Sequence, residues 1–236
     1  MLIITNKTYG LNDEVKLMSD IKLINVKESI LTDNDNDALF LREKLEKENV
    51  FMLNIMSSPG AGKTSLIIAT LKTLQDKYRI GVIEGDIDSM VDSEKIVQNG
   101  GHAVQINTGG DCHLDSFMIK SAIDTMDLDN YDVIIIENIG NLVCPAEFDT
   151  GANLNVMILS VPEGDDKILK YPLMFQVCDV LIINKIDCVK MFDFNFDALM
   201  NRAALVNPKM KIFQVSAKTG EGIEAWCDWL SEKITV

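Results

Sequence analysis

The chain has 236 residues, which fits one large domain or two small ones and is ample for a buried core. It is 47% hydrophobic and 25% charged, as globular proteins are, so a disordered or fibrous chain is excluded. Its net charge of −14 argues against binding to a nucleic acid backbone or an anionic membrane surface. No transmembrane run, no secretory signal and no disulfide-like spacing of the five cysteines is present, so a cytoplasmic location is expected.

Residues 1–31 have a mixed pattern and are treated as an N-terminal extension. The next segment predicts a helix over residues 33–48, with Thr32 or Asp33 as its cap and an apolar face that carries Ala38, Leu39, Leu41 and Leu45. The charged residues on its other face predict a solvated surface.

From residue 51 onward, short apolar runs alternate with segments of helical period. The runs are 51–56, 80–83, 104–106, 133–136, 156–161, 180–183 and 212–215. Continuous apolar strands that alternate with helices predict a parallel sheet covered on both faces. We therefore predict an α/β domain with a doubly wound, mostly parallel, seven-stranded sheet and helices on both faces. Ligands of such sheets bind beyond the carboxyl ends of the strands.

A phosphate-binding loop follows the first run. The segment Ser57-Ser58-Pro59-Gly60-Ala61-Gly62-Lys63-Thr64 has the spacing GxxxxGK[ST], with Ser57 in place of the first glycine. In such a loop backbone N–H groups surround phosphate oxygens, Lys63 neutralises the terminal phosphates and the Thr64 hydroxyl reaches Mg²⁺. The predicted phosphate contacts are Pro59, Gly60, Ala61, Gly62, Lys63, Thr64 and Ser65.

A guanine-reading segment follows the sixth run. Asn184-Lys185-Ile186-Asp187 matches the sequence NKxD, in which one carboxylate, here Asp187, accepts from both N1–H and the N2 amine of guanine. Adenine lacks this pair of donors and would leave the carboxylate unpaired. Ser216-Ala217-Lys218, after the seventh run, matches the loop that supports the same base through backbone N–H groups. GTP is therefore the expected nucleotide.

Carboxylates end two of the intervening runs, in Glu84-Gly85-Asp86 and in Glu137-Asn138-Ile139-Gly140. The second stands where ordinary GTPases carry Asp-x-x-Gly, and its carboxylate can hold Mg²⁺ directly or through water. We predict that Thr64, Asp86 and Glu137 bind Mg²⁺ and that Lys63, Thr64 and Asp86 are catalytic. The alternative for each carboxylate is a solvated acid at a strand end. Asp88 and Asp92 are candidates for orienting the attacking water.

The negative charge concentrates near the predicted strand ends. The acids concerned are Glu84, Asp86, Asp88, Asp92 and Glu94, and, after the fifth run, Glu163, Asp165 and Asp166. This field favours divalent cations and disfavours the GTP anion. Affinity for GTP must then come from local N–H groups, Lys63 and Mg²⁺.

Two cysteines and a histidine follow neighbouring runs: Cys112 and His113 the third, Cys144 the fourth. Two thiolates and an imidazole suit zinc, nickel or copper, although free cysteines are often small buried hydrophobes. Three ligands leave one tetrahedral position for water, substrate or a second subunit. Cys178, Cys188 and Cys227 are interpreted as core or surface thiols.

These segments resemble the HypB family of hydrogenase maturation GTPases from about Thr32 to the C-terminus. Besides the phosphate and guanine motifs, the resemblance rests on Gln105-Ile106-Asn107-Thr108-Gly109 leading to Cys112-His113-Leu114-Asp115, on Glu137-Asn138-Ile139-Gly140-Asn141-Leu142-Val143-Cys144-Pro145-Ala146, on Glu163-Gly164-Asp165-Asp166-Lys167 and on Lys170-Tyr171-Pro172.

The resemblance implies a slow P-loop GTPase of the nucleotide-dependent-dimer class. Such a protein would donate nickel to [NiFe]-hydrogenase large-subunit precursors together with a partner nickel chaperone. Cys112, His113 and Cys144 would bind nickel or zinc at the interface of a homodimer that forms with GTP. Residues 1–50 contain no Cys or His, so the separate N-terminal nickel site of many members is not expected. Lys167 is a candidate contact to nucleotide or dimer partner, although Ile168 stands where the family commonly has proline.

Two other functions fit the same residues. One is GTP-dependent maturation of another metalloenzyme, such as urease or a cobalamin enzyme. The other is a nucleotide-gated metal-binding or storage module whose hydrolysis is incidental. Residues 184–187 disfavour an ATP-dependent kinase. The predicted organisation is an extension at 1–31 and a GTPase domain at 32–236.

Overall fold

The computed structural model of the chain describes residues 26–87 and 89–234, so most of the predicted extension, and Asp88, lie outside the described residues. The first described helix, α2, spans Val26–Lys47. The predicted start at residue 33 is therefore wrong, and Thr32 and Asp33 lie inside the helix. Leu39 was expected on the apolar face but is exposed, whereas Ala38, Leu41 and Leu45 are buried. A neighbouring cap-type residue, Asn34, uses its side chain for tertiary bonds, to the Asp149 carbonyl at 3.0 Å and from the Ser116 N–H at 2.9 Å. Side chains of this kind favour helix starts only when they bind the backbone of their own helix.

The predicted seven-stranded sheet is confirmed, and its paired strands are all parallel, in the order β3-β2-β4-β1-β5-β6-β7. The strands are β1 (Phe51–Ser57), β2 (Ile80–Asp86), β3 (His102–Asn107), β4 (Val133–Glu137), β5 (Leu154–Ser160), β6 (Val180–Asn184) and β7 (Lys211–Gln214). The central strands are apolar almost throughout because helices cover both of their faces.

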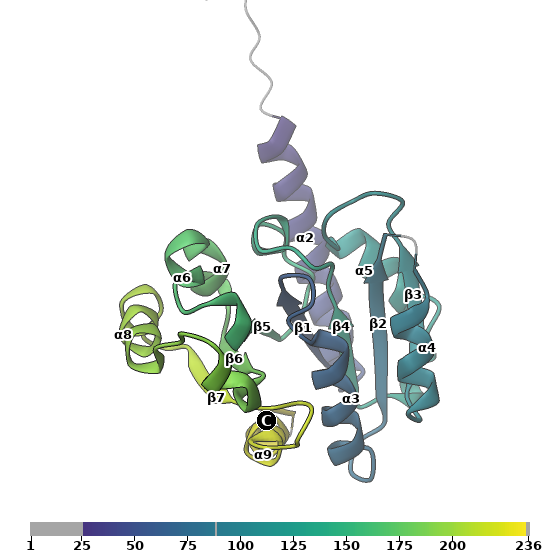
Figure 1. Cartoon of the computed structure of the whole chain (residues 1–236). Coiled ribbons are helices and arrows are strands. Elements are labelled where there is room, and N and C mark those ends of the chain that lie inside the picture. Colours follow the sequence, from purple (N-terminus) through teal and green to yellow (C-terminus); the bar gives the residue numbers. More distant parts are fainter. Residues whose placement is uncertain (1–25, 88, 235–236) are drawn as a thin grey trace, which may run out of the picture.

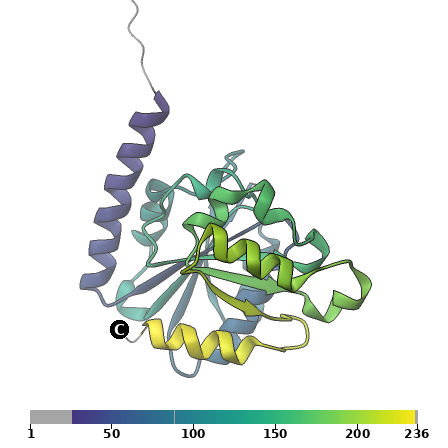
Figure 2. The same ribbon diagram turned by 90° about the vertical axis from the view of Figure 1, so that its left-hand side faces the viewer.

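Helices form a layer on each face of the sheet. They are α3 (Lys63–Leu74), α4 (Val91–Gln98), α5 (Ser116–Ile123), α6 (Lys167–Lys170), α7 (Pro172–Val177), α8 (Phe196–Val206) and α9 (Ile223–Ile234), with short 3₁₀ turns η1 (Leu128–Asn130), η2 (Cys144–Ala146), η3 (Val161–Glu163) and η4 (Ile186–Met191). Figure 1 shows α3 and α4 in front of the sheet and α2 and α5 behind it. The first turns of α2 extend beyond the body of the domain, as Figure 2 also shows.

Alternate residues of each strand enter different cores because successive side chains point to opposite faces. Val133 and Ile135 of β4 join the core under α3, α4 and α9. Ile134 and Ile136 join the core under α2 and α5. A third core lies between strands β5 and β6 and helices α7 and α8. Among the described residues, no helix combines the length and apolarity needed to cross a membrane.

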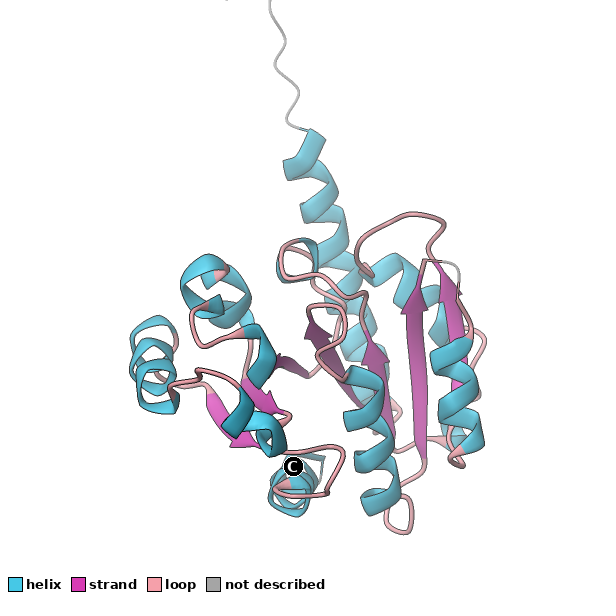
Figure 3. Ribbon diagram, viewed as in Figure 1, coloured by secondary structure: helices cyan, strands magenta, loops and turns pink. Residues whose placement is uncertain are grey.

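The register brings the predicted site segments to one edge of the sheet. Glu137 at the end of β4 pairs with Ile55 of β1 on one side and with Glu84 of β2 on the other. Phosphate loop, acidic strand ends and cysteine loops therefore meet where the strands end. Figure 3 shows the long loop after β3 at this edge.

Candidate functional site

The phosphate loop joins β1 to α3 and takes a shape that needs glycine. Gly62 has φ +104°, and a Cβ there would lie 2.5 Å from Asn184 Nδ2. Directly after this turn, Lys63 opens α3 and its ammonium donates to Ser57 Oγ at 3.3 Å. The positive end of α3 and the lysine thus face the same loop, an arrangement suited to binding phosphate.

Side chains from two other strand ends hold this loop. Lys185 Nζ donates to the Gly60 carbonyl at 2.6 Å, and Asn184 Nδ2 donates to the Ala61 carbonyl at 3.0 Å. On the other side, the Ser58 hydroxyl donates to Glu163, which also accepts from Ser160 N–H at 2.8 Å. The loop is therefore largely ordered before nucleotide enters, which lowers the entropy lost on binding.

The predicted guanine residues, except Ser216, line one hollow of about 330 Å³. Its walls comprise Gly62, Ser65, Asn184, Lys185, Asp187, Cys188, Ala217 and Lys218. Asn184 Oδ1 accepts from the N–H groups of Lys185 at 2.8 Å and Ala217 at 3.1 Å, which joins the two base-binding loops. Ser216 Oγ donates to Asp187 Oδ1 at 2.6 Å, and this hydrogen bond lowers the pKa of Asp187. The carboxylate is therefore ionised at neutral pH and can accept from two donors.

A second hollow of about 290 Å³ lies on the other side of the phosphate loop. Its walls include Pro59, Gly60, Lys63, Glu84, Asp86, Asp92, Glu137 and Gly140. Thr64 Oγ1 donates to Glu137 Oε1 at 2.8 Å, so two of the three predicted magnesium ligands touch. Asp86 lines the same hollow, and its Oδ1 accepts from the Ser89 N–H at 2.8 Å.

Three carboxylates meet in this hollow: oxygen atoms of Glu84, Asp92 and Glu137 lie within 4.8 Å of one another. Burial raises the pKa of Glu137 to about 7. Burial, followed by the charges of Glu137 and Asp86, raises the pKa of Glu84 to about 7. Glu137 Oε2 is buried and has no hydrogen-bond partner among the described residues. Hard oxygen donors, one of them unsatisfied, fit the preference of Mg²⁺.

The cluster differs from the predicted magnesium set. The prediction grouped Asp86 with Glu137, whereas Glu84 and Asp92 are the acids grouped with Glu137 in the structure. The sequence did contain a signal for Glu84, because this residue directly follows the apolar run 80–83 of β2. A carboxyl group buried at such a position needs a cation or a hydrogen-bond partner.

The predicted soft-metal residues also come together. Cys112 Sγ and Cys144 Sγ are 2.8 Å apart, and Cys112 Sγ is 3.9 Å from His113 Nδ1. The His113 ring stacks on Phe148 with 3.8 Å between centroids, which fixes its plane. Cys112 is exposed and the other two are half-buried, so a second molecule can approach them. The hydrogen bond with Cys144 raises the pKa of Cys112. A bound cation would have the opposite effect on both thiols.

The remaining described cysteines lie away from this triad. Cys178 and Cys227 are buried in the cores. Cys188 lies in the guanine hollow, with its Sγ 3.5 Å from Asp187 Oδ2. The candidate Lys167 is placed over the ring of Tyr171, 5.5 Å from its centroid.

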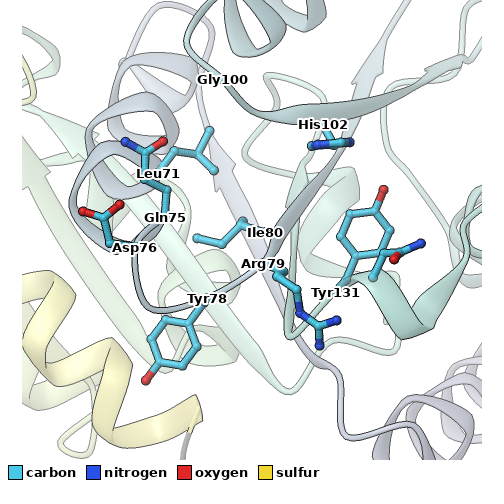
Figure 4. A pocket seen from close by; sticks show the side chains of 10 residues that line it. Leu71, Gln75, Asp76, Tyr78, Arg79, Ile80, Gly100, His102 and Tyr131 are labelled. Atoms are coloured by element: carbon cyan, nitrogen blue, oxygen red, sulfur yellow. The ribbon is translucent and has the colours of Figure 1, made fainter.

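A further hollow of about 510 Å³ opens at the opposite end of the sheet, where β2 and β3 begin (Figure 4). Tyr78, Arg79, His102 and Tyr131 are among its walls. The Arg79 guanidinium donates to Asp132 and to the Asp129 carbonyl. Because these acceptors occupy the arginine, this hollow lacks the features of a phosphate site.

Residues 51–214 match the family model described as "CobW/HypB/UreG, nucleotide-binding domain". "Hydrogenase maturation factor HypB" of Rhizobium leguminosarum bv. viciae is 46% identical over 213 residues, 90% of this chain and 71% of the relative. "Hydrogenase/urease maturation factor HypB" of Helicobacter pylori is 40% identical over 91% of this chain and 88% of its own length. The crystal structure of Helicobacter pylori HypB in complex with nickel superposes with a TM-score of 0.82 at 40% identity, covering 86% of this chain and 95% of that one. The chain therefore belongs to the HypB GTPases of the CobW/HypB/UreG family.

Proposed function

We propose that this HypB-family GTPase delivers nickel to a [NiFe]-hydrogenase precursor and that GTP controls the delivery through a homodimer. The observation that carries the proposal is the continuity of one segment. Glu137, at its start, contacts the phosphate loop through Thr64, and Cys144, seven residues later, contacts Cys112. Nucleotide and metal would therefore act on the same short piece of backbone.

Each nucleotide contact has a specific role in this proposal. Lys63 neutralises charge on the terminal phosphates, and the backbone N–H groups that follow Gly60 bind their oxygens. Asp187 selects guanine by accepting from two adjacent donors. Thr64, Glu137 and Asp86 would hold Mg²⁺, with Glu84 and Asp92 beside them. Mg²⁺ supplies charge stabilisation to the transferring phosphoryl group.

The proposed nickel site supplies three soft ligands, Cys112, His113 and Cys144. A tetrahedral or square-planar ion needs at least a fourth ligand. The exposure of Cys112 allows a second copy of the chain to approach, and two half-sites would then face each other. Hydrolysis would loosen the pair and release the ion toward a partner nickel chaperone or the hydrogenase precursor.

A transfer assay tests this function. The full chain is loaded with Ni²⁺, mixed with hydrogenase precursor and given GTP, GDP or a non-hydrolysable GTP analogue, and nickel in the precursor is measured. Transfer is expected with GTP and suppressed with the analogue. Equal transfer with all three nucleotides would overturn nucleotide control. Cys144→Ala, which is expected not to load, and Lys63→Ala, which is expected to load without responding to GTP, are the two controls.

Urease maturation is the second candidate, because the Helicobacter pylori relative is named a hydrogenase/urease factor and shares 40% identity. The same assay with urease apoprotein in place of the hydrogenase precursor distinguishes the two. Faster transfer to urease would make it the preferred acceptor.

A further inference from the structure

The loop that carries His113 is fastened on both sides of that residue to the segment following β4. Asn141 Nδ2 donates to the Cys112 carbonyl at 3.2 Å. Asn138 Oδ1 accepts from the Leu114 N–H at 3.1 Å. Two asparagines, three positions apart in one segment, thus hold the residues immediately before and after His113.

The same segment touches the phosphate loop at two points. Glu137 accepts from Thr64 Oγ1 at 2.8 Å. Gly140 lies so close to Pro59 that a Cβ on it would be 3.0 Å from both the Cα and the N of Pro59. Along this segment, residues 137 and 140 therefore contact nucleotide-binding residues, whereas residues 138 and 141 contact the loop that carries His113.

A buried polar chain fixes the orientation of Asn138, which is fully buried. Its Nδ2 donates to Asn54 Oδ1 at 3.1 Å, and Asn54 Nδ2 donates to Asn155 Oδ1 at 3.1 Å. Its Oδ1 must then face the N–H groups of Leu114 and Ile139, since a flipped amide would place donors against donors. The end of β4 is thereby tied to β1 and β5 at the centre of the sheet.

Asn141 is less constrained. It is half-buried, and its Oδ1 accepts from the Val143 N–H of its own loop at 3.0 Å. A displacement of Gly140 caused by phosphate beside Pro59 would therefore move Asn141 and, through its Nδ2, the Cys112 carbonyl. Asn138 would hold the Leu114 side of the loop in place meanwhile.

We propose that Asn138 and Asn141 are positioning residues. Asn141 transmits the nucleotide state to the Cys112–His113–Cys144 site, and Asn138 holds the other end of the His113 loop against the sheet. The inference rests on the proposed function, since it names the residues that link the two sites. Neither asparagine needs to touch nucleotide or metal. Removing the link should leave both sites able to bind and should abolish only the effect of one on the other.

The experiment measures the Ni²⁺ affinity of the full chain with GDP and with a non-hydrolysable GTP analogue. The ratio of the larger to the smaller of these two affinities reports the link between the sites. The variants are Asn141→Ala and Asn138→Ala. Asn207→Ala is a matched control, because Asn207 is also half-buried, donates Nδ2 to backbone carbonyls, among them Cys178 at 2.8 Å, and accepts from an N–H two residues later. Hydrogen exchange at the Leu114 amide provides a readout that needs no metal.

In the wild type, linked sites typically give a ratio of about 5 to 150. Asn141→Ala is expected to bring the ratio below about 2 while each nucleotide still binds within about threefold of wild type. Asn138→Ala should also speed exchange at Leu114, and Asn207→Ala should leave the wild-type ratio. If Asn141→Ala retains the wild-type ratio, or Asn207→Ala lowers it equally, the inference is overturned and the proposed function stands. A wild-type ratio of 1 overturns instead the nucleotide control on which both depend.

Discussion

Replacing Glu137 by glutamine should stabilise the nucleotide-free protein while disabling it. Glu137 is 2% exposed, and one of its carboxyl oxygens has no hydrogen-bond partner in the part of the chain that the structure describes. Burial raises its pKa from 4.5 to about 7. Glutamine keeps an oxygen that accepts from Thr64 Oγ1. Its amide can donate to Glu84 or Asp92, which lie within 4.8 Å of the native carboxylate. The buried charge disappears without loss of volume.

The magnitude follows from the pKa. A carboxyl whose folded pKa is raised destabilises the fold once it ionises, so stability is lost as pH rises from about 4.5 to about 7. Each pKa unit corresponds to about 1.4 kcal/mol, which gives about 3 kcal/mol above pH 7 and nothing below pH 4.5. For a domain of this size, the melting temperature of the variant at pH 8 should exceed that of wild type by about 6–12 °C.

Calorimetry at pH 4.5 and pH 8, with a chelator and without nucleotide, measures this difference. Glu48→Gln, which changes an exposed carboxyl, is the control. Addition of Mg²⁺ and GTP should reverse the order, because only the wild type gains binding energy from the carboxylate. The claim that ionised Glu137 destabilises the fold would be refuted by either of two results. One is a variant less stable than wild type at pH 8, and the other is an equal shift in melting temperature at both pH values.

The remaining predictions concern the other contacts. Lys63→Ala should lower the turnover of GTP by at least about 100-fold, and near-normal turnover would remove the phosphate-loop assignment. Asp187→Asn should weaken GTP binding by about 100-fold or more and improve xanthosine triphosphate binding; unchanged selectivity in competition assays would contradict its role. Gly140→Ala should weaken binding of a GTP analogue by about 1–3 kcal/mol, because its Cβ meets the Pro59 backbone, and calorimetry measures this. Cys144→Ala should lower Ni²⁺ affinity by more than about 100-fold in equilibrium dialysis and leave nucleotide binding of the monomer unchanged.

The strands were predictable because burial on both faces leaves a signature in local sequence. The run 133–136, for example, corresponds to β4, which is buried at every position. The start of α2 was not predictable in this way. Its cap-type residue Asn34 binds Asp149 and Ser116, and such tertiary bonds connect residues more than 80 positions apart.

The linear motifs predicted residues for phosphate and guanine that the structure brings together, because each motif is one strand-end loop. The Glu84–Asp92–Glu137 cluster depends instead on the pairing of β2 with β4, which local sequence does not specify. The asparagine contacts to Cys112 and Leu114 depend on loop geometry in the same way. Two acids expected to attract divalent cations, Asp165 and Asp166, pair with Arg202 at 2.6 Å and Lys170 at 2.6 Å.

In the proposed function, GTP and the nickel ion act on each other through the segment from Glu137 to Cys144. Mass and nickel content of the same sample, measured by light scattering and elemental analysis with GDP and then with a GTP analogue, test it most directly. A monomer is expected with GDP, and a dimer that retains more nickel at equal free Ni²⁺ is expected with the analogue. Identical mass and nickel content in both states would contradict it.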